Sequence, residues 1–143
     1  MEDGTARAQL DAESSERFVA LRRQLGVSSF GINQIVLQPG QRGRIHRHQR
    51  QEEVYLVLEG SLTLMVEEEQ LELAEGELIR LAPALRRQVV NRGPRRLVLL
   101  ALGGEGEHNG RDGEAFSSWS EEAGAPPQEV PLPADLDPTD VGG

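Results

Sequence analysis

The stretch that decides the fold is residues 40–60, GQRGRIHRHQRQEEVYLVLEG. Two of the three histidines in the chain, His46 and His48, stand one residue apart in it, and Glu53 opens the apolar run 54–58. Side chains of an extended strand alternate between its two faces, so both histidines point the same way. Two imidazoles on one face, with a carboxylate from the following strand, are a ligand set for a divalent transition metal.

The spacing of this stretch is Gly, five residues, His, one residue, His, four residues, Glu, six residues, Gly. It resembles the first signature motif of the cupin superfamily at all its marked positions, which are Gly40, His46, His48, Glu53 and Gly60. The resemblance implies an all-β fold: a single antiparallel β-barrel of the double-stranded β-helix or jelly-roll type. It also implies a metal or ligand pocket inside the barrel.

Residues 76–91, GELIRLAPALRRQVVN, resemble the second cupin signature. The interval between the outer landmarks fits, and Pro83 lies in the expected turn. The turn departs from the family where proline and glycine are usual, at Ala82 and Ala84. A more serious departure is Arg87, which occupies the position of the family's third histidine ligand.

Arg87 leaves two interpretations open. Arginine stays protonated and has no lone pair for a metal, so the resemblance leaves His46, His48 and Glu53 as ligands of iron, manganese, nickel or zinc. Such a set resembles the two-histidine, one-carboxylate triad of non-haem iron sites, which keeps positions open for substrate. Alternatively, Arg87 forms a bidentate salt bridge with Glu53, which removes the carboxylate and leaves the histidines as ordinary pocket residues.

Three residues are candidates for substrate binding, and no catalytic residue is identified. Tyr55 shares the face of Glu53, so its hydroxyl either meets a ligand or belongs to the core. Arg44 shares the face of His46, and together with Arg87 it either holds an anionic substrate such as a carboxylate or covers the barrel rim.

The sequence pattern divides the chain into a lead-in with a short helix (1–26), the barrel (27–102) and an acidic tail (103–143). The helix is expected from Ser14 to Leu25 because apolar residues recur there at intervals of three and four. About eight short strands at the spacing of an all-β barrel follow; they are expected at 29–37, 44–48, 54–58, 62–66, 71–74, 78–81, 86–91 and 95–102. The charged residues 67–70 are expected to form a turn.

The tail is rich in glycine, proline and acidic residues. Residues 103–143 contain ten acidic residues, one arginine and five of the eight prolines, so the tail cannot form a core of its own. Its two aromatic residues, Phe116 and Trp119, predict that part of it docks on the barrel or on a partner subunit. Residues after about Asp135 are expected to be disordered, and His108 is expected to be a surface histidine.

Composition excludes several kinds of chemistry. The chain has neither cysteine nor lysine, so disulfides, thiolate sites and lysine Schiff bases are excluded. The net charge of −9 belongs to the tail, which argues against nucleic acid as a partner. No stretch resembles a signal core or a membrane span, so a cytoplasmic protein is expected. The family resemblance implies a homodimer, with the N-terminal helix or strand and the Trp119 segment as candidate contacts.

These observations leave competing functions. The first is a metal-dependent enzyme, of the dioxygenase or isomerase type, that acts on a small organic substrate, with an anionic substrate as the narrower expectation. The second is a metal-free barrel that binds or senses a small ligand, with an Arg87–Glu53 salt bridge in place of the metal site. A third is a structural oligomer with a vestigial pocket. Metal content distinguishes the first from the others.

Overall fold

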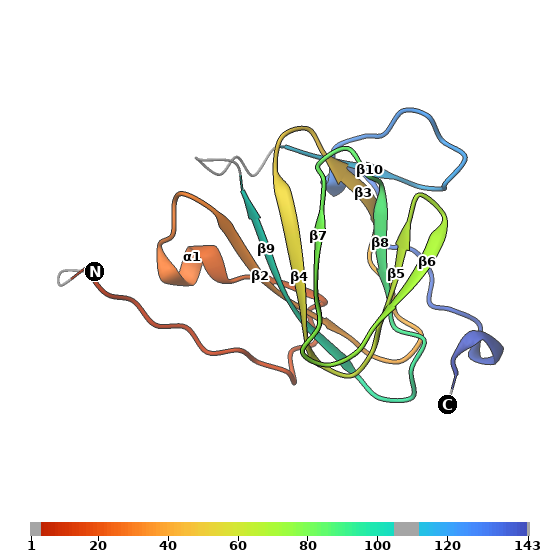
Figure 1. The fold of residues 1–143 in the computed structure, drawn as a ribbon, viewed down its shortest axis with the longest axis horizontal. Coiled ribbons are helices and arrows are strands. Elements are labelled where there is room, and N and C mark those ends of the chain that lie inside the picture. The colour runs from red at the N-terminus through yellow and green to blue at the C-terminus, as the bar shows by residue number, and fades with distance from the viewer. Residues whose placement is uncertain (1–3, 105–111, 143) are drawn as a thin grey trace.

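The computed structural model describes residues 4–104 and 112–142, which form ten strands, one α-helix and two short 3₁₀ helices (Figure 1). The strands are β1 (Phe18–Ala20), β2 (Gly31–Leu37), β3 (Ile45–His48), β4 (Glu52–Glu59), β5 (Leu62–Val66), β6 (Glu69–Leu73), β7 (Leu78–Leu81), β8 (Arg87–Val90), β9 (Leu97–Gly104) and β10 (Gly113–Phe116). The helices are α1 (Leu21–Leu25), η1 (Pro127–Glu129) and η2 (Pro138–Asp140). Within the described part of the chain, none of them is long and apolar enough to cross a membrane.

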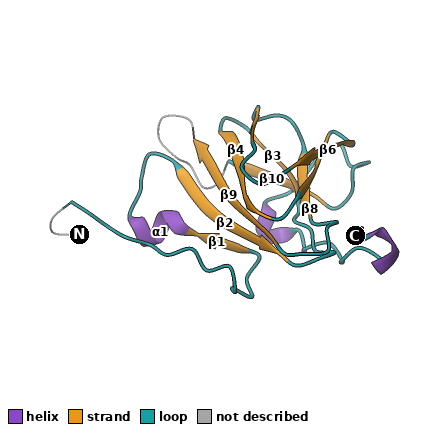
Figure 2. Ribbon diagram, turned by 60° about the horizontal axis from the view of Figure 1, so that its bottom comes forward, coloured by secondary structure: helices purple, strands orange, loops and turns teal. Residues whose placement is uncertain are grey.

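The strands form two antiparallel sheets, in the orders β1-β2-β9-β4-β7 and β10-β3-β8-β5-β6. The sheets pack face to face, as Figure 2 shows, which confirms the expected all-β jelly roll. Their inward side chains form one apolar core: Ile35, Leu37, Tyr55, Val57, Leu62, Leu64, Leu73, Leu81, Val89, Leu97, Leu99 and Ala101. On β4 the buried residues alternate with more exposed ones, as a strand with one face toward a core requires.

The expected helix from Ser14 to Leu25 is corrected by the structure. Only Leu21–Leu25 are helical; Phe18–Ala20 form β1, which pairs with the edge of β2, and residues 14–17 are neither helix nor strand. The three- and four-residue spacing does not mark a buried helical stripe, because Phe18 is 55% exposed. The free edge of β2 offers backbone hydrogen bonds that outweigh this weak helical pattern. The helix ends at Gly26 as expected, with φ at 70°.

Two turns show how local chemistry sets the register. The turn expected over residues 67–70 is shorter than that: Glu67 and Glu68 adopt positive φ, and β6 already begins at Glu69. At the end of β4, Gly60 has φ of 83°, and a Cβ there would lie 2.4 Å from the Arg96 carbonyl oxygen. Glycine is therefore required at this motif position both by conformation and by the close approach of β9.

The strand with the two histidines is held mainly by the C-terminal segment. β10 pairs with β3 at four positions, whereas β8 pairs with it only at His46↔Arg87. On the outer side of this sheet, the Arg86 guanidinium lies over the rings of Phe116 and Trp119. The tail thus contacts the barrel within the described residues, although the three-part domain division remains a prediction.

The expected disorder after Asp135 does not match the structure. The backbone N–H of Leu136 donates to the Gly40 carbonyl at 2.7 Å, and that of Gly142 donates to the Arg92 carbonyl at 2.6 Å. Composition predicts disorder because this stretch has little apolar content. Backbone hydrogen bonds to the barrel need no apolar side chains, so the amino-acid composition does not predict them.

Candidate metal centre

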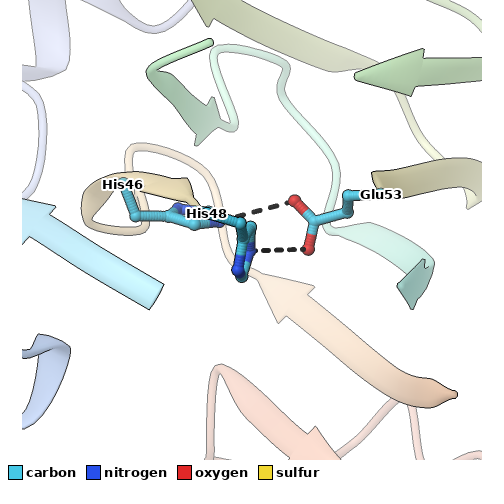
Figure 3. Close-up of side chains that lie close together, drawn as sticks. All are labelled: His46, His48 and Glu53. Atoms are coloured by element: carbon cyan, nitrogen blue, oxygen red, sulfur yellow. Dashed lines mark ion pairs between the residues drawn. The ribbon is translucent and has the colours of Figure 1, made fainter. Parts of the chain in front are cut away.

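The centre is built from two consecutive strands, one in each of the two facing sheets, and the loop that joins them. His46 and His48 extend from β3 and Glu53 from β4, with residues 49–51 between the strands. Glu53 directs one carboxylate oxygen to each histidine (Figure 3): Oε1 lies 3.4 Å from His46 Nε2, and Oε2 lies 3.8 Å from His48 Nε2. One donor atom from each of the three residues lies within 4.8 Å of the others. The structure thus brings together the three residues that the motif spacing selects.

The three side chains differ in exposure, which gives the centre an open side. The Glu53 side chain is 10% exposed, while those of His46 and His48 are 22% and 17% exposed. Burial tends to raise the pKa of Glu53, but the nearby His46 and His48 rings and the charge of Arg87 hold it well below its usual value. The carboxyl is therefore an ionised acceptor, and the histidine side of the centre is its more solvent-exposed side.

Arg87 is completely buried behind Glu53. Its Nε lies 3.6 Å from Glu53 Oε1, while its terminal nitrogens donate to the carbonyls of Pro83 at 3.2 Å and Ala82 at 3.1 Å. The salt bridge is thus a single contact and not the bidentate one considered above. A guanidinium with no exposed surface meets no dissolved anion in this structure, and the role of Arg87 as a substrate anchor stays a prediction from the sequence.

Tyr55 and Arg44 also lie away from the open side. Tyr55 is 1% exposed, and burial together with the neighbouring Glu53 charge raises the pKa of its hydroxyl well above the usual value. Its hydroxyl therefore faces Glu53 from within the core. Arg44 precedes β3, and its Nε donates to the Val130 carbonyl at 2.5 Å, so it does not share the face of His46. It lines a pocket of about 260 Å³ between the barrel and the tail, with Gln88 and Trp119 among the other walls.

The structure adds one residue that the sequence interpretation missed. Asp112 is 6% exposed, and its Oδ2 lies 3.8 Å from His48 Nδ1, on the side of the ring away from Glu53. The sequence offered little signal for it, because Asp112 lies in the acidic, glycine-rich segment with many similar carboxylates. The third histidine, His108, lies outside the described residues.

The donor set fits a divalent transition metal. Metal–ligand distances of about 2.0–2.2 Å place neighbouring donor atoms roughly 3–3.5 Å apart, and the three donor atoms here lie within 4.8 Å of one another, so a small inward movement would let them share one ion. Glu53 Oε1 is also buried without a hydrogen-bond partner among the described residues, as expected of an atom that awaits a cation. Arg87 opposes this fit in charge, because its fixed positive charge lies beside the carboxylate.

Comparison with known proteins agrees with this architecture. Residues 33–103 match the family described as "Cupin domain". No curated protein sequence matches the chain. Among solved structures, a cupin protein from Bacteroides fragilis has a TM-score of 0.62 and 20% identity, and the match covers 71% of this chain and 84% of that one.

Two further structures bear on the comparison. A Cupin 2 conserved barrel domain protein from Salinispora arenicola has a TM-score of 0.61 and 21% identity, covering 69% of this chain and 87% of that one. A provisionally assigned sugar phosphate isomerase from Acidithiobacillus ferrooxidans has a TM-score of 0.57 and 29% identity, covering 64% of this chain and 58% of that one. The likeness to these structures shows the fold, and the family match over residues 33–103, with the two signature motifs, shows that the chain belongs to the cupin superfamily.

Proposed function

We propose that the protein is a small metal-dependent cupin that binds one divalent transition metal through His46, His48 and Glu53. The observation that carries the proposal is the approach of three donor atoms, from one strand of each facing sheet, to within 4.8 Å of one another. Iron, manganese, nickel and zinc all accept such mixed imidazole and carboxylate ligands. Three protein ligands leave coordination positions for a substrate.

We further propose that the bound metal acts on a small, oxygen-containing organic molecule. The metal would act as a Lewis acid toward an oxygen of that molecule. Glu53 holds its charge at the site because its pKa is lowered, while the histidines form the accessible side. Directly beneath Glu53 the interior is filled by Tyr55 and the apolar core, so only a small substrate fits.

An isomerase reaction is the more specific form of this proposal. It is supported by the 29% identity to the protein provisionally assigned as a sugar phosphate isomerase. A dioxygenase reaction uses the same type of site and is the competing enzyme assignment. A phosphate group bound at the open side would require a cationic side chain there. Neither arginine supplies it, because Arg87 is buried and Arg44 faces the tail.

The second candidate is a metal-free barrel that binds a small ligand. It is supported by the Arg87 Nε contact with Glu53, since a guanidinium already partly neutralises the carboxylate. In that case the two histidines and Glu53 bind a neutral or cationic ligand by hydrogen bonds. Metal content separates the two candidates.

The test is elemental analysis of untagged protein in which two adjacent glutamates are exchanged separately. Glu53 faces the site, and Glu52 faces outward to Arg80, so Glu52→Gln is a matched control for Glu53→Gln. We expect about one metal per chain in the wild type and in the control. We expect its loss in Glu53→Gln and in His46→Ala. Wild-type protein that stays metal-free after incubation with iron, manganese, nickel or zinc would refute the proposal and favour the metal-free barrel.

We also propose that the protein forms a homodimer through the outer face of β4 and its neighbours. Leu78 is 61% exposed there, and Leu58 at the end of β4 is 39% exposed. The N-terminal segment and the Trp119 segment remain the alternative contacts predicted from the sequence. A cytoplasmic location and the absence of a nucleic-acid partner remain predictions from the sequence.

A further inference from the structure

Asp112 is placed to organise the metal centre without touching the metal. Its Oδ2 lies 3.8 Å from His48 Nδ1, whereas the other ring nitrogen, Nε2, faces Glu53. The imidazole ring thus separates Asp112 from the ligand atoms. A histidine that binds a metal through one ring nitrogen carries its proton on the other, and that N–H requires an acceptor.

The outer nitrogen of His48 lacks such an acceptor at hydrogen-bond distance. Among the described residues, His48 Nδ1 is buried and has no hydrogen-bond partner, and the Asp112 carboxylate faces it across an ion-pair distance. A shift of roughly 0.6 Å would bring the two atoms within the hydrogen-bond range. Metal binding at Nε2 would fix the proton on Nδ1 and favour that shift.

The same carboxylate also holds the loop that joins the ligand strands. Asp112 Oδ2 accepts the backbone N–H groups of Arg50 and Gln51, each at 2.9 Å, and the Asp112 carbonyl accepts that of Gln49 at 3.2 Å. The loop leads from His48 directly to β4 and Glu53. Asp112 therefore fixes the backbone between two of the three donors as well as facing one donor ring.

Charge gives Asp112 a further role. With neutral histidines, Glu53 and Arg87 nearly cancel, so the three-residue centre alone attracts a divalent cation only weakly. Both carboxylate oxygens of Asp112 accept backbone N–H groups of loop 49–51, an arrangement that suits the anionic form of the group. Its negative charge compensates for the positive charge of Arg87 at the position of the family's third histidine.

We propose that Asp112 is a positioning residue of the metal centre: it orients His48, fixes loop 49–51 and supplies the charge that Arg87 removes. The inference rests on the proposed metal site. Asp112 arrives from the segment after the matched family region, which ends at residue 103. A chain with arginine in place of the third ligand thus gains a supporting carboxylate from outside that region.

The test is a cobalt(II) titration of the full chain, followed by the visible d–d absorption with a competing chelator. Asp112→Asn keeps an oxygen that can accept the two loop N–H groups and removes the charge, while Asp112→Ala removes both. The matched control is Asp137→Asn, since Asp137 also accepts a backbone N–H, from Thr139, but lies in the tail near η2. Amide hydrogen exchange of Arg50 and Gln51 in metal-free protein reports the loop separately.

We expect cobalt affinity to fall about tenfold in Asp112→Asn and up to about a hundredfold in Asp112→Ala, with an altered d–d spectrum. The control should stay within about twofold of the wild type. Exchange at Arg50 and Gln51 should accelerate in Asp112→Ala. Wild-type affinity and spectrum in Asp112→Asn would overturn the inference while leaving the metal site intact. Absence of cobalt binding by the wild type would instead refute the proposed function and this inference with it.

Discussion

Replacing Arg87 by methionine tests the energetics of the centre most directly. Arg87 is fully buried and Glu53 is 8% exposed, so Arg87→Met leaves a buried carboxylate without its arginine. Removing one partner of a buried ion pair costs about 3–5 kcal/mol. The Ala82 carbonyl also loses a donor, at about 1 kcal/mol or more, whereas the Pro83 carbonyl keeps the backbone N–H of His48. Methionine refills most of the volume of the arginine stem, so the cavity contribution is small.

The assay is thermal unfolding of metal-free protein, followed by circular dichroism. The predicted loss corresponds to a fall in Tm of roughly 8–20 °C for a domain of this size. The control is Arg80→Met, because Arg80 pairs with the neighbouring Glu52 on the outer face and both side chains are more than half exposed. An exposed pair contributes at most about 1 kcal/mol. Equal Tm values for the two variants would refute the assignment of Arg87 as the buried partner of Glu53.

Metal should then rescue the Arg87→Met variant more than it stabilises the wild type. A ligand at a hundred times its Kd stabilises the folded state by about 2.7 kcal/mol. In the variant the metal takes the place of the positive Arg87 partner beside Glu53, and no guanidinium repels it. The Kd of the metal should therefore be lower in the variant than in the wild type. The measurement is the rise in Tm of both proteins with added zinc or cobalt. A variant that stays destabilised at saturating metal would show that Glu53 does not face a cation site.

Three further predictions follow from contacts away from the centre. Gly60→Ala should lower the midpoint of urea unfolding much more than Gly76→Ala does. Both glycines have positive φ, but an added Cβ would meet the Arg96 carbonyl at Gly60, whereas at Gly76 it would meet nothing within 4 Å. Equal losses in the two variants would contradict this prediction. The Arg96 hydrogen bond lowers the pKa of Glu59, so this pair contributes stability above the usual glutamate pKa and loses it as pH falls through the folded value. An NMR titration should therefore show Glu59 titrating at unusually low pH and returning to the ordinary range in Arg96→Gln. Leu78→Arg should shift the proposed dimer toward monomer in light scattering at several concentrations, and a wild type that is monomeric throughout would exclude the interface.

The sequence predicted the fold through its resemblance to the cupin signature motifs, and it predicted the three donor residues from their positions in the first motif. His46 and His48 share a face by strand alternation, and a short loop returns the chain so that Glu53 arrives beside them. The position of Arg87 also followed from the second motif, and the structure pairs it directly with His46. Motif spacing thus located the centre, although it could not determine whether a metal binds there.

The errors occur where tertiary contacts outweigh local pattern. Arg44 would point to the same face as His46 only if the strand included it. However, β3 begins at Ile45, and the Arg44 side chain donates a hydrogen bond to the Val130 carbonyl of the tail. The apolar pattern around Phe18 is compatible with a helix and with a strand. Pairing with the free edge of β2 makes this segment a strand. Asp112 is remote in sequence from His48 and becomes its neighbour only through the pairing of β10 with β3. Such long-range pairings leave no periodic signal in one sequence.

The pairing of β10 with β3 has a consequence for how the protein can be shortened. The matched family region ends at residue 103, which makes that point an inviting place to end an expression clone. A chain cut there would turn the histidine strand into an edge strand, with a row of unsatisfied N–H and C=O groups open to a strand from another molecule. Insoluble or domain-swapped product is the expected outcome of that truncation, even though every residue of both signature motifs would still be present.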